Sequence, residues 1–352
     1  MREFIEKNLR EIVNIKSESE GDMEEIIDFT TSLLDDIGLE YEVIDVEDIS
    51  PVILASYGEG GVCFSGHLDT VPIGEGWEHE QGEVVEDKMY GRGTLDMKGP
   101  CVSMIATAKR LIEKEVPFSL IFTTDEEVSM DGAEHVAERK EVTEAPAVVV
   151  CEPTEMRVVN QEKGVYQFEI TTKGKNAHAS MPEKGENAIV KILPILESLS
   201  RKNNIPAEKD EMTCCVDVIE GGKATNVIPE SCRAEVDVRF PDHFNKEILK
   251  KYLFDPIDEE FDLREIQFLD SVKVDIEKEP VQKLIEVAEA ETWSVPYGTE
   301  MVRFYQTNEN TMIFGPGKVD SAHQPDEYID LPQLVEVVDI YTEYAEAMVD
   351  SD

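Results

Sequence analysis

The sequence predicts an α/β protein whose main domain is interrupted by an inserted α+β domain. Two observations support this prediction. Short continuous apolar runs, typical of buried parallel strands, alternate with amphipathic helices near both ends of the chain. After about residue 162 the pattern changes to strands in which apolar and polar residues alternate. We therefore expect a discontinuous main domain, residues 1–162 and 273–352, and an inserted domain, residues 163–272.

The main domain is expected to begin with helices and to continue with buried strands. Apolar residues at helical spacing predict helices over residues 1–16, 22–37 and 99–115. Strands are expected over residues 38–46, 51–58, 62–66, 118–124 and 145–151. The same pattern returns after residue 273, with a helix at 280–292, a strand at 311–315 and a helix at 331–348.

The inserted domain shows six elements in a recognisable order. Alternating patterns predict strands at 166–174, 213–222, 232–240 and near 263–270, and helical spacing predicts helices at 186–202 and 245–253. The resulting order, β-α-β-β-α-β, is typical of a small ferredoxin-like layer.

The charge balance excludes some classes of partner. Lys and Arg number 33 and Asp and Glu number 77, so the net charge is −44. Such a surface repels nucleic acid and anionic membranes. The acids are spread along the chain, which favours a solvated acidic surface over an acidic tail. Strong salt screens the self-repulsion of such a surface, so we hypothesise a halophilic cytosol.

Neither the N-terminus nor the cysteines indicate export. The first 15 residues predict an amphipathic helix rather than a signal peptide, and no apolar run approaches the ~20 residues that span a bilayer. The six cysteines show no CxxC spacing, and most lie in apolar runs. We interpret them as reduced core residues of a cytoplasmic protein.

Residues capable of chemistry follow four predicted strands. His67, the pair Glu126–Glu127, Glu152 and His323 each come just after a buried run. Ligands of open α/β sheets collect at the carboxyl ends of the strands. Asp96, in GRGTLDMKG just before the helix at 99–115, is a further candidate. An HxD motif alone is usually part of a turn, and acid pairs in so acidic a chain are usually solvated, but neither explanation accounts for four strand ends together.

The candidate set is His67, Asp96, Glu127, Glu152 and His323. Two imidazoles and three carboxylates suit a pair of Zn²⁺-like ions that share one carboxylate. Asp69 would then fix the tautomer of His67 from behind. Glu126 and Glu127 diverge on extended backbone, so one can bind metal while the other acts as a general base.

Seven motifs occur in an order that resembles a known family. They are GHLDTVP, GRGTLDMKG, TTDEE, CEPT, GKNAHASMPEKGENAI, TNVIP and GPGKVDSAHQPDEY. Together they resemble the dizinc amidohydrolases that include acetylornithine deacetylase, succinyl-diaminopimelate desuccinylase, glutamate carboxypeptidase and aminoacylase. The resemblance spans residues 60–345. It implies a zinc-peptidase-like catalytic domain with a mixed sheet and flanking helices, and an inserted lid domain that also forms a homodimer.

The resemblance also implies roles for individual residues. One zinc would be held by His67 and Glu152, the other by Glu127 and His323, and Asp96 would bridge them; Co²⁺ or Mn²⁺ are possible substitutes. Glu126 would be the base that activates a metal-bridging water, and Asp69 would support His67. His178 would reach a neighbouring subunit's active site and stabilise the oxyanion. The Asp96–Met97 peptide would be cis.

The substrate implied is an N-acylated amino acid, with acetylornithine or a lysine-pathway analogue first. The loop GPGKVDSAHQPDEY and the stretch YGTEMVRFY are most similar to the acetylornithine deacetylase branch. Glu300 could suit a cationic side chain, or it could belong to the acidic surface. Asn226 and Arg239 match lid positions that contact substrate, and Arg303 is another possible clamp; surface salt bridges are the alternative for both arginines.

Three alternatives remain open. A succinyl-diaminopimelate desuccinylase is disfavoured because its GTSD-like stretch reads GTEM here. A dipeptidase or carboxypeptidase of the same family is a second alternative. A non-catalytic, metal-binding relative is the third, and the presence of all five ligands and of Glu126 argues against it.

Overall fold

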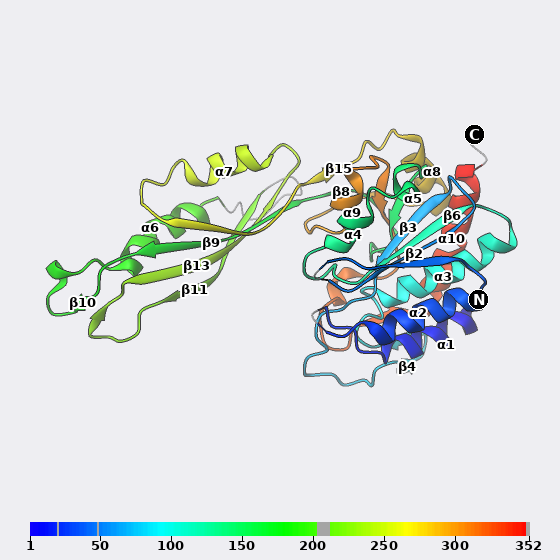
Figure 1. Ribbon diagram of the computed structural model, residues 1–352, viewed down its shortest axis with the longest axis horizontal. Coiled ribbons are helices and arrows are strands. Elements are labelled where there is room, and N and C mark those ends of the chain that lie inside the picture. Colours follow the sequence, from blue (N-terminus) through cyan, green and yellow to red (C-terminus); the bar gives the residue numbers. More distant parts are fainter. Residues whose placement is uncertain (20, 48, 203–211, 350–352) are drawn as a thin grey trace. The chain divides into compact units, whose positions relative to one another are not determined.

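The computed structural model describes residues 1–19, 21–47, 49–202 and 212–349. The chain divides into two compact units (Figure 1). Unit 1 comprises Met1–Asn160, Val274–Trp293 and Thr299–Asp352, and unit 2 comprises Gln161–Lys273 and Ser294–Gly298. The short segment 294–298, which we expected in the main domain, therefore belongs to unit 2.

Unit 1 is built on a mixed β-sheet. Its strands follow the order β1-β2-β6-β3-β7-β17-β8. They are β1 (Tyr41–Ile44), β2 (Val52–Tyr57), β3 (Val62–His67), β6 (Phe118–Thr123), β7 (Val148–Val150), β17 (Thr311–Ile313) and β8 (Val158–Glu162). The four central strands β6, β3, β7 and β17 are parallel, whereas β1 and β2 are antiparallel additions at one edge. The expected mixed sheet is confirmed.

Helices cover this sheet, and every residue of β3, β6, β7 and β17 is buried. That burial explains their continuous apolar sequences. Helices α1 (Arg2–Val13), α3 (Lys98–Glu113) and α10 (Leu331–Val349) contact one another, and α10 also contacts α8 (Glu279–Ala288). The remaining helices are α2 (Glu24–Asp36), α4 (Asp131–Val136), α5 (Lys140–Thr143) and α9 (Met301–Tyr305).

One predicted helix is too long. The helix expected at 280–292 ends at Ala288, because Glu289 adopts a left-handed conformation with φ 49°. The chain then enters strand β16 (Thr292–Val295). Left-handed backbone commonly terminates a helix, usually at glycine. A glutamate at this position gives no sequence signal for the end.

A small three-stranded sheet was not expected from the sequence. Strand β5 (Lys88–Tyr90) lies between β4 (Val84–Val85) and β18 (Tyr328–Asp330). Tyr328 is opposite Tyr90 in the antiparallel β18–β5 pair. This pairing places the loop that follows His323 beside the loop that precedes Asp96.

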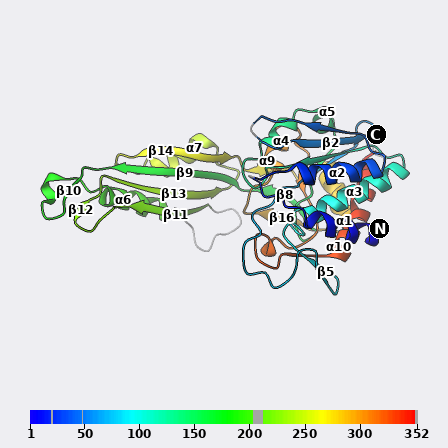
Figure 2. The same cartoon turned by 60° about the horizontal axis from the view of Figure 1, so that its bottom comes forward.

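Unit 2 has the expected ferredoxin-like order. Its elements are β9 (Gly164–Lys173), α6 (Ala188–Ser200), β11 (Thr213–Gly221), β13 (Ser231–Phe240), α7 (Lys246–Phe254) and β14 (Asp262–Leu269). The sheet order is β11-β13-β9-β14, and every pair is antiparallel (Figure 2). Side chains of β9 and β13 pack with α6 and α7 in one core. Strand β15 (Val272–Lys273) pairs with Gln161 and Glu162 of β8, and β10 (Ala177–His178) pairs with β12 (Val227–Ile228).

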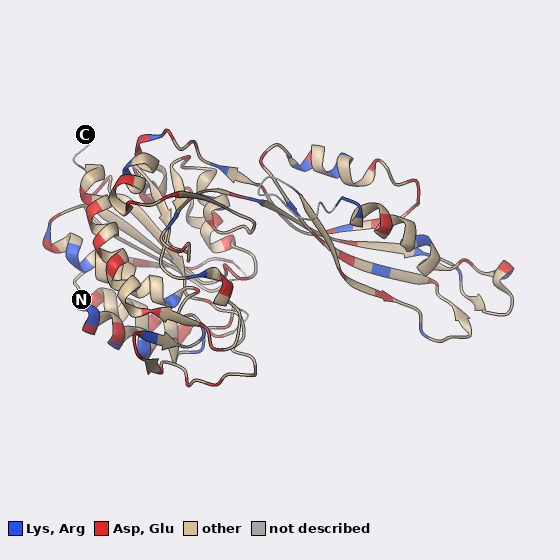
Figure 3. Cartoon of the chain, turned by 180° about the vertical axis from the view of Figure 1, so that it is seen from behind, with Lys and Arg blue, Asp and Glu red and all other residues tan. Residues whose placement is uncertain are grey.

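Acidic residues are spread over the helices and strands of both units rather than gathered in one block (Figure 3). All six cysteines are free, and only Cys215 is exposed. No helix in the described part of the chain combines the length and the apolar character needed to cross a membrane.

Candidate active site

The carboxyl ends of the parallel strands bring the candidate residues together. His67 is the last residue of β3, Glu126 and Glu127 follow β6, and Glu152 follows β7. Because these neighbouring strands run in the same direction, their ends lie at one edge of the sheet. The site therefore follows from the order and direction of three strands.

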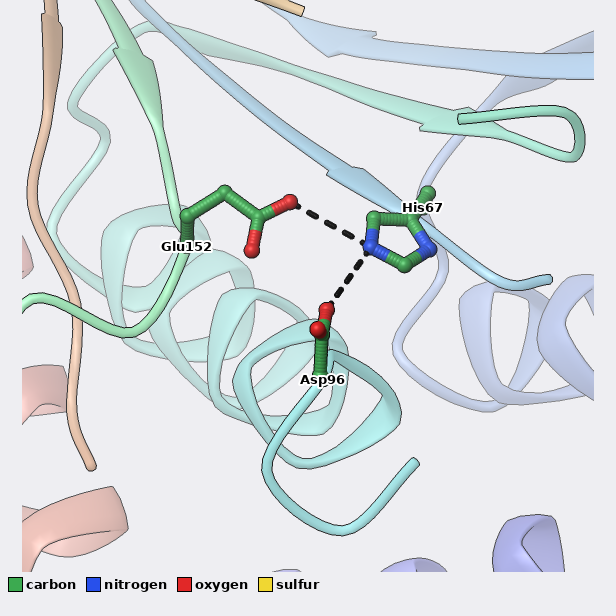
Figure 4. Close-up of side chains that lie close together, drawn as sticks. All are labelled: His67, Asp96 and Glu152. Carbon is green, nitrogen blue, oxygen red and sulfur yellow. Dashed lines mark hydrogen bonds and ion pairs between the residues drawn. The ribbon is translucent and has the colours of Figure 1, made fainter. Parts of the chain in front are cut away.

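A first cluster surrounds the buried ring of His67. Its Nε2 lies 3.0 Å from Asp96 Oδ1 and 3.2 Å from Glu152 Oε1. Figure 4 shows both carboxylates pointing at this one nitrogen, Glu152 from the chain after β7 and Asp96 from the segment before α3. The donor atoms lie within 4.8 Å of one another, close enough to hold one ion.

A second cluster uses the other oxygen of Asp96. His323 Nε2 lies 3.3 Å from Asp96 Oδ2 and 3.0 Å from Glu127 Oε1. Asp96 thus offers Oδ1 to the first cluster and Oδ2 to the second. One imidazole and two carboxylates per cluster, with a shared carboxylate, are a donor set that suits two divalent ions of the zinc type. The peptide between Asp96 and Met97 is cis.

Asp69 lies behind His67 on the side away from the clusters. His67 Nδ1 is 2.9 Å from the Asp69 carbonyl oxygen and 3.3 Å from Asp69 Oδ1. Ser19 donates its hydroxyl to Asp69 Oδ2 at 2.7 Å. With the Nδ1 proton facing Asp69, the lone pair on Nε2 is available to a ligand.

Glu126 belongs to neither cluster but lies beside the first. Its Oε2 is 4.0 Å from His67 Nε2. Burial, reinforced by the negative charges of Glu152, Glu127 and Asp96, raises the pKa of Glu126 well above its ordinary value. A carboxyl with a raised pKa next to a polar cluster is suited to proton transfer near neutral pH.

Burial and the neighbouring charges shift the pKa values of the residues in both clusters. Burial opposes the charge on His67, but the surrounding carboxylates outweigh it and raise the pKa of His67 well above its usual range. Burial raises the pKa of Glu152 to about 7. Hydrogen bonds to Asp96 and Glu127 raise the pKa of His323 to about 10. Cations are therefore strongly favoured at this edge of the sheet.

Three polar residues that the sequence analysis missed shape the site. The Asp125 carboxylate accepts the N–H groups of Asp131 and Gly132 and so folds the loop that carries Glu126 and Glu127. Thr154 exchanges hydrogen bonds with the backbone of Gly315, between the chain after β7 and the end of β17. Buried Glu327 contacts the loop of Asp96. All three lie inside the motifs TTDEE, CEPT and GPGKVDSAHQPDEY, which was the available signal, but in a chain so rich in acid the residue type alone assigned no role to Asp125 or Glu327.

Unit 2 separates the expected lid residues. His178 in β10 is opposite Val227 in β12, and Ala179 donates its N–H to the carbonyl of Asn226. His178 and Asn226 are therefore neighbours on the exposed surface of unit 2.

Arg239 lies near the other end of β9, opposite Val165. The strand extends roughly 27 Å from there to Lys173, at about 3.4 Å per residue. The guanidinium of Arg239 is bound to both carboxylate oxygens of Asp237, at 2.7 and 2.9 Å. Within one chain, Arg239 and the His178–Asn226 pair are too far apart to contact the same small substrate.

The two remaining candidates for substrate contact, Glu300 and Arg303, have partners within the chain. Glu300 is only 1% exposed, so it does not present its carboxylate to an accessible surface. Its Oε2 instead accepts the hydroxyl of Ser65 in β3 at 3.4 Å. Arg303 is not a free clamp either, because its guanidinium contacts Glu134 at 2.5 Å and the carbonyl of Ser129 at 3.1 Å.

Residues 63–347, most of the chain, match the model of the peptidase family M20/M25/M40. The chain belongs to this family. It is 30% identical to an acetylornithine deacetylase of Aliivibrio fischeri, over 87% of this chain and 86% of that protein. It is 25% identical to a probable succinyl-diaminopimelate desuccinylase of Staphylococcus aureus, over 97% and 98% of the two chains.

A solved M20 family structure, the Bacillus subtilis YXEP protein described as a dinuclear metal-binding peptidase, covers 100% of this chain with a TM-score of 0.75 and 18% identity. The match covers 99% of that structure, so the likeness of fold extends over both units. As a member of the M20 family, the chain is an enzyme that acts on amide bonds.

Proposed function

We propose that this M20 family enzyme removes the acyl group from an N-acylated amino acid, with N-acetylornithine or a lysine-pathway analogue as the substrate. The observation that carries the proposal is the position of Glu126 beside two clusters that share Asp96. The acetylornithine deacetylase relative and the similar loop around His323 support the choice of substrate. Glu300 no longer supports it, because its side chain is buried.

We propose that each cluster holds one divalent ion, zinc in the first place and Co²⁺ or Mn²⁺ as substitutes. The ligands are His67, Asp96 and Glu152 for one ion, and Asp96, Glu127 and His323 for the other. Two such ions would supply Lewis-acid polarisation of the amide carbonyl and lower the pKa of water. Asp69 keeps Nε2 of His67 directed at the first cluster.

The side chains of the protein perform the proton transfers. Glu126 takes a proton from the attacking water and returns it to the nitrogen of the leaving amino acid. His178 stabilises the negative charge that develops on the carbonyl oxygen. Ser180 donates its N–H to His178 Nδ1, which leaves the proton on Nε2 for this purpose. The products are a free carboxylate and an amino acid.

Desuccinylation is the second candidate, and hydrolysis of a dipeptide is the third. The S. aureus relative, which matches over 97% of this chain, favours the succinyl substrate. An enzyme of this kind acting on acetylornithine would belong to arginine biosynthesis. The two reactions would share the metal centre and differ in the acyl group and the amino acid that the enzyme must recognise.

The deciding experiment is hydrolysis by the purified protein in high salt. N-acetylornithine, N-acetyllysine, N-succinyl-diaminopimelate and a dipeptide are offered with Zn²⁺ or Co²⁺, and then with a chelator. We expect preference for the acetylated basic amino acid and loss of turnover with chelator. Preference for the succinyl compound would replace our first candidate by the second. Turnover that survives complete metal removal would overturn the proposed centre.

We further propose a homodimer, formed through unit 2, that works in a salt-rich cytoplasm. The net charge of −44 and the six free cysteines support this setting. A dimer would also give His178, an exposed residue of unit 2, a neighbouring site to complete.

A further inference from the structure

Glu327 makes four hydrogen bonds to a single loop. It is 0% exposed, and its backbone carbonyl accepts the N–H of Gly91 at 2.9 Å. Its Oε2 accepts from Arg92 Nη1 at 2.5 Å. Its Oε1 accepts the N–H groups of Leu95 and Asp96 at 3.0 and 3.2 Å. The carboxylate thus binds directly to the backbone of the residue that both clusters share.

Glu327 also lies four residues after His323, in the same loop. His323 has a left-handed backbone, φ 61°, and its side chain is 48% exposed, so its position depends on how the loop that carries it is held. The loop is fixed further on, where Asp326 Oδ1 accepts the N–H groups of Glu78 and His79 at 2.9 and 3.0 Å. After Glu327 the chain enters β18, which pairs with β5.

We propose that Glu327 is a positioning residue of the metal centre. It belongs to the loop of His323 and binds the loop of Asp96, and in this way it sets the separation of Asp96 and His323. Arg92 supplies the opposite charge that a buried carboxylate requires. Glu327 belongs to neither group of potential ligands among the described residues. The inference rests on the metal centre proposed above, and its test separates the two.

Two substitutions separate the effect of the charge of Glu327 from the effect of its length. Glu327→Gln keeps the length and an acceptor for the N–H groups of Leu95 and Asp96 but loses the charge opposite Arg92. Glu327→Asp keeps the charge but is one methylene shorter, so it cannot span both loops without moving them. Glu336→Gln, which changes an exposed acid of α10 by the same net charge, is the matched control.

The measurement is the affinity of the metal-free proteins for Co²⁺, followed by absorbance, and for Zn²⁺, followed by competition with a chelating dye. We expect two ions per chain for the wild type and for Glu336→Gln. Glu327→Asp should bind about 10- to 100-fold more weakly, which is the usual effect of removing a group that orients a ligand. Glu327→Gln should fall between this variant and the wild type.

Thermal unfolding of the metal-free variants distinguishes positioning from general stability. A merely structural role predicts a lower melting temperature with unchanged affinity in the folded variants, and that result would overturn the inference while leaving the metal centre intact. Weaker binding by Glu327→Gln than by Glu327→Asp would also overturn it, because charge rather than reach would then be decisive. If the wild type binds no ion, the proposed centre itself fails.

Discussion

Asp69 binds the ring of His67 and, with the same carboxylate, the backbone of Glu126. Its Oδ1 lies 3.3 Å from His67 Nδ1 and 3.2 Å from the Glu126 N–H, and its Oδ2 lies 3.2 Å from the Glu127 N–H. One buried carboxylate therefore orients a proposed ligand from β3 and both acids of the loop after β6. The resemblance implied only the first of these contacts.

Asp69→Asn should lower metal affinity or turnover more than the loss of one negative charge elsewhere on the protein does. An amide has one acceptor oxygen, so it cannot accept from His67 and from both backbone N–H groups together. We expect metal affinity or turnover to fall by about 10- to 100-fold. Metal titration and steady-state kinetics measure this, with Asp45→Asn, an exposed acid, as the control. Equal metal affinity and turnover in the two variants would show that Asp69 does not support the site.

Glu126→Gln should bind metal normally and lose turnover. Loss of a positioned general base reduces the rate by about 10²- to 10⁴-fold. In the wild type, the base must be deprotonated to act. Activity should therefore rise with pH as Glu126 loses its proton, and Glu126→Gln should not show this rise. Glu126→Gln with wild-type turnover would contradict the mechanism.

His178 can be tested by mixing two inactive proteins. If His178 acts in the neighbouring subunit, each active site combines Glu126 of one chain with His178 of the other. A His178→Ala chain then lacks only the histidine, and a Glu126→Gln chain lacks only the base. Random exchange of a 1:1 mixture should then restore about a quarter of wild-type activity, because one site in four would contain both residues. The assay is turnover before and after refolding the chains together. No recovery from chains shown to form mixed dimers would place His178 in its own subunit's site or outside catalysis.

Glu300 should affect stability rather than substrate choice. Burial raises the pKa of Glu300 to about 8, so the carboxyl is protonated in the folded protein at pH 7. The unfolded chain ionises it at lower pH, and the folding free energy it contributes is therefore full below about pH 4 and lost as pH rises towards 8. Glu300→Gln should lose less stability over this range than the wild type, as measured by melting temperature against pH. A changed preference between acetylated basic and neutral amino acids would instead restore its role as a selector.

Salt should stabilise the protein through charge screening. Raising the ionic strength from 0.1 to 1 M shortens the Debye length from ~10 to ~3 Å and weakens repulsion within a surface of net charge −44. We expect the melting temperature to rise steadily over this range of KCl. Sorbitol at matched osmolality is the control, because it does not screen charge. A flat response to KCl would contradict the halophile hypothesis.

Much of the proposed centre could be predicted from the sequence because its residues follow strands. The apolar runs that end at His67 and before Glu126 and Glu152 are buried on both faces, so their sequences identify both the strand and its end. Once such strands are known to be parallel neighbours, their carboxyl ends must meet. The periodicity of the inserted segment similarly predicted a ferredoxin-like sheet, because in β9 and β13 buried residues alternate with partly exposed ones along the strand.

The tertiary structure alone decided how these residues are held. Glu327 and Asp125 lie in motifs that the sequence analysis quotes, but they act by accepting backbone N–H groups, and the sequence does not show which N–H groups those are. Glu300 is buried beside Ser65, and Arg303 pairs with Glu134. Both partners are distant in sequence, so neither contact could be predicted from the local pattern. Local pattern determines which face of an element is apolar, whereas the partner of a polar group depends on how the elements pack.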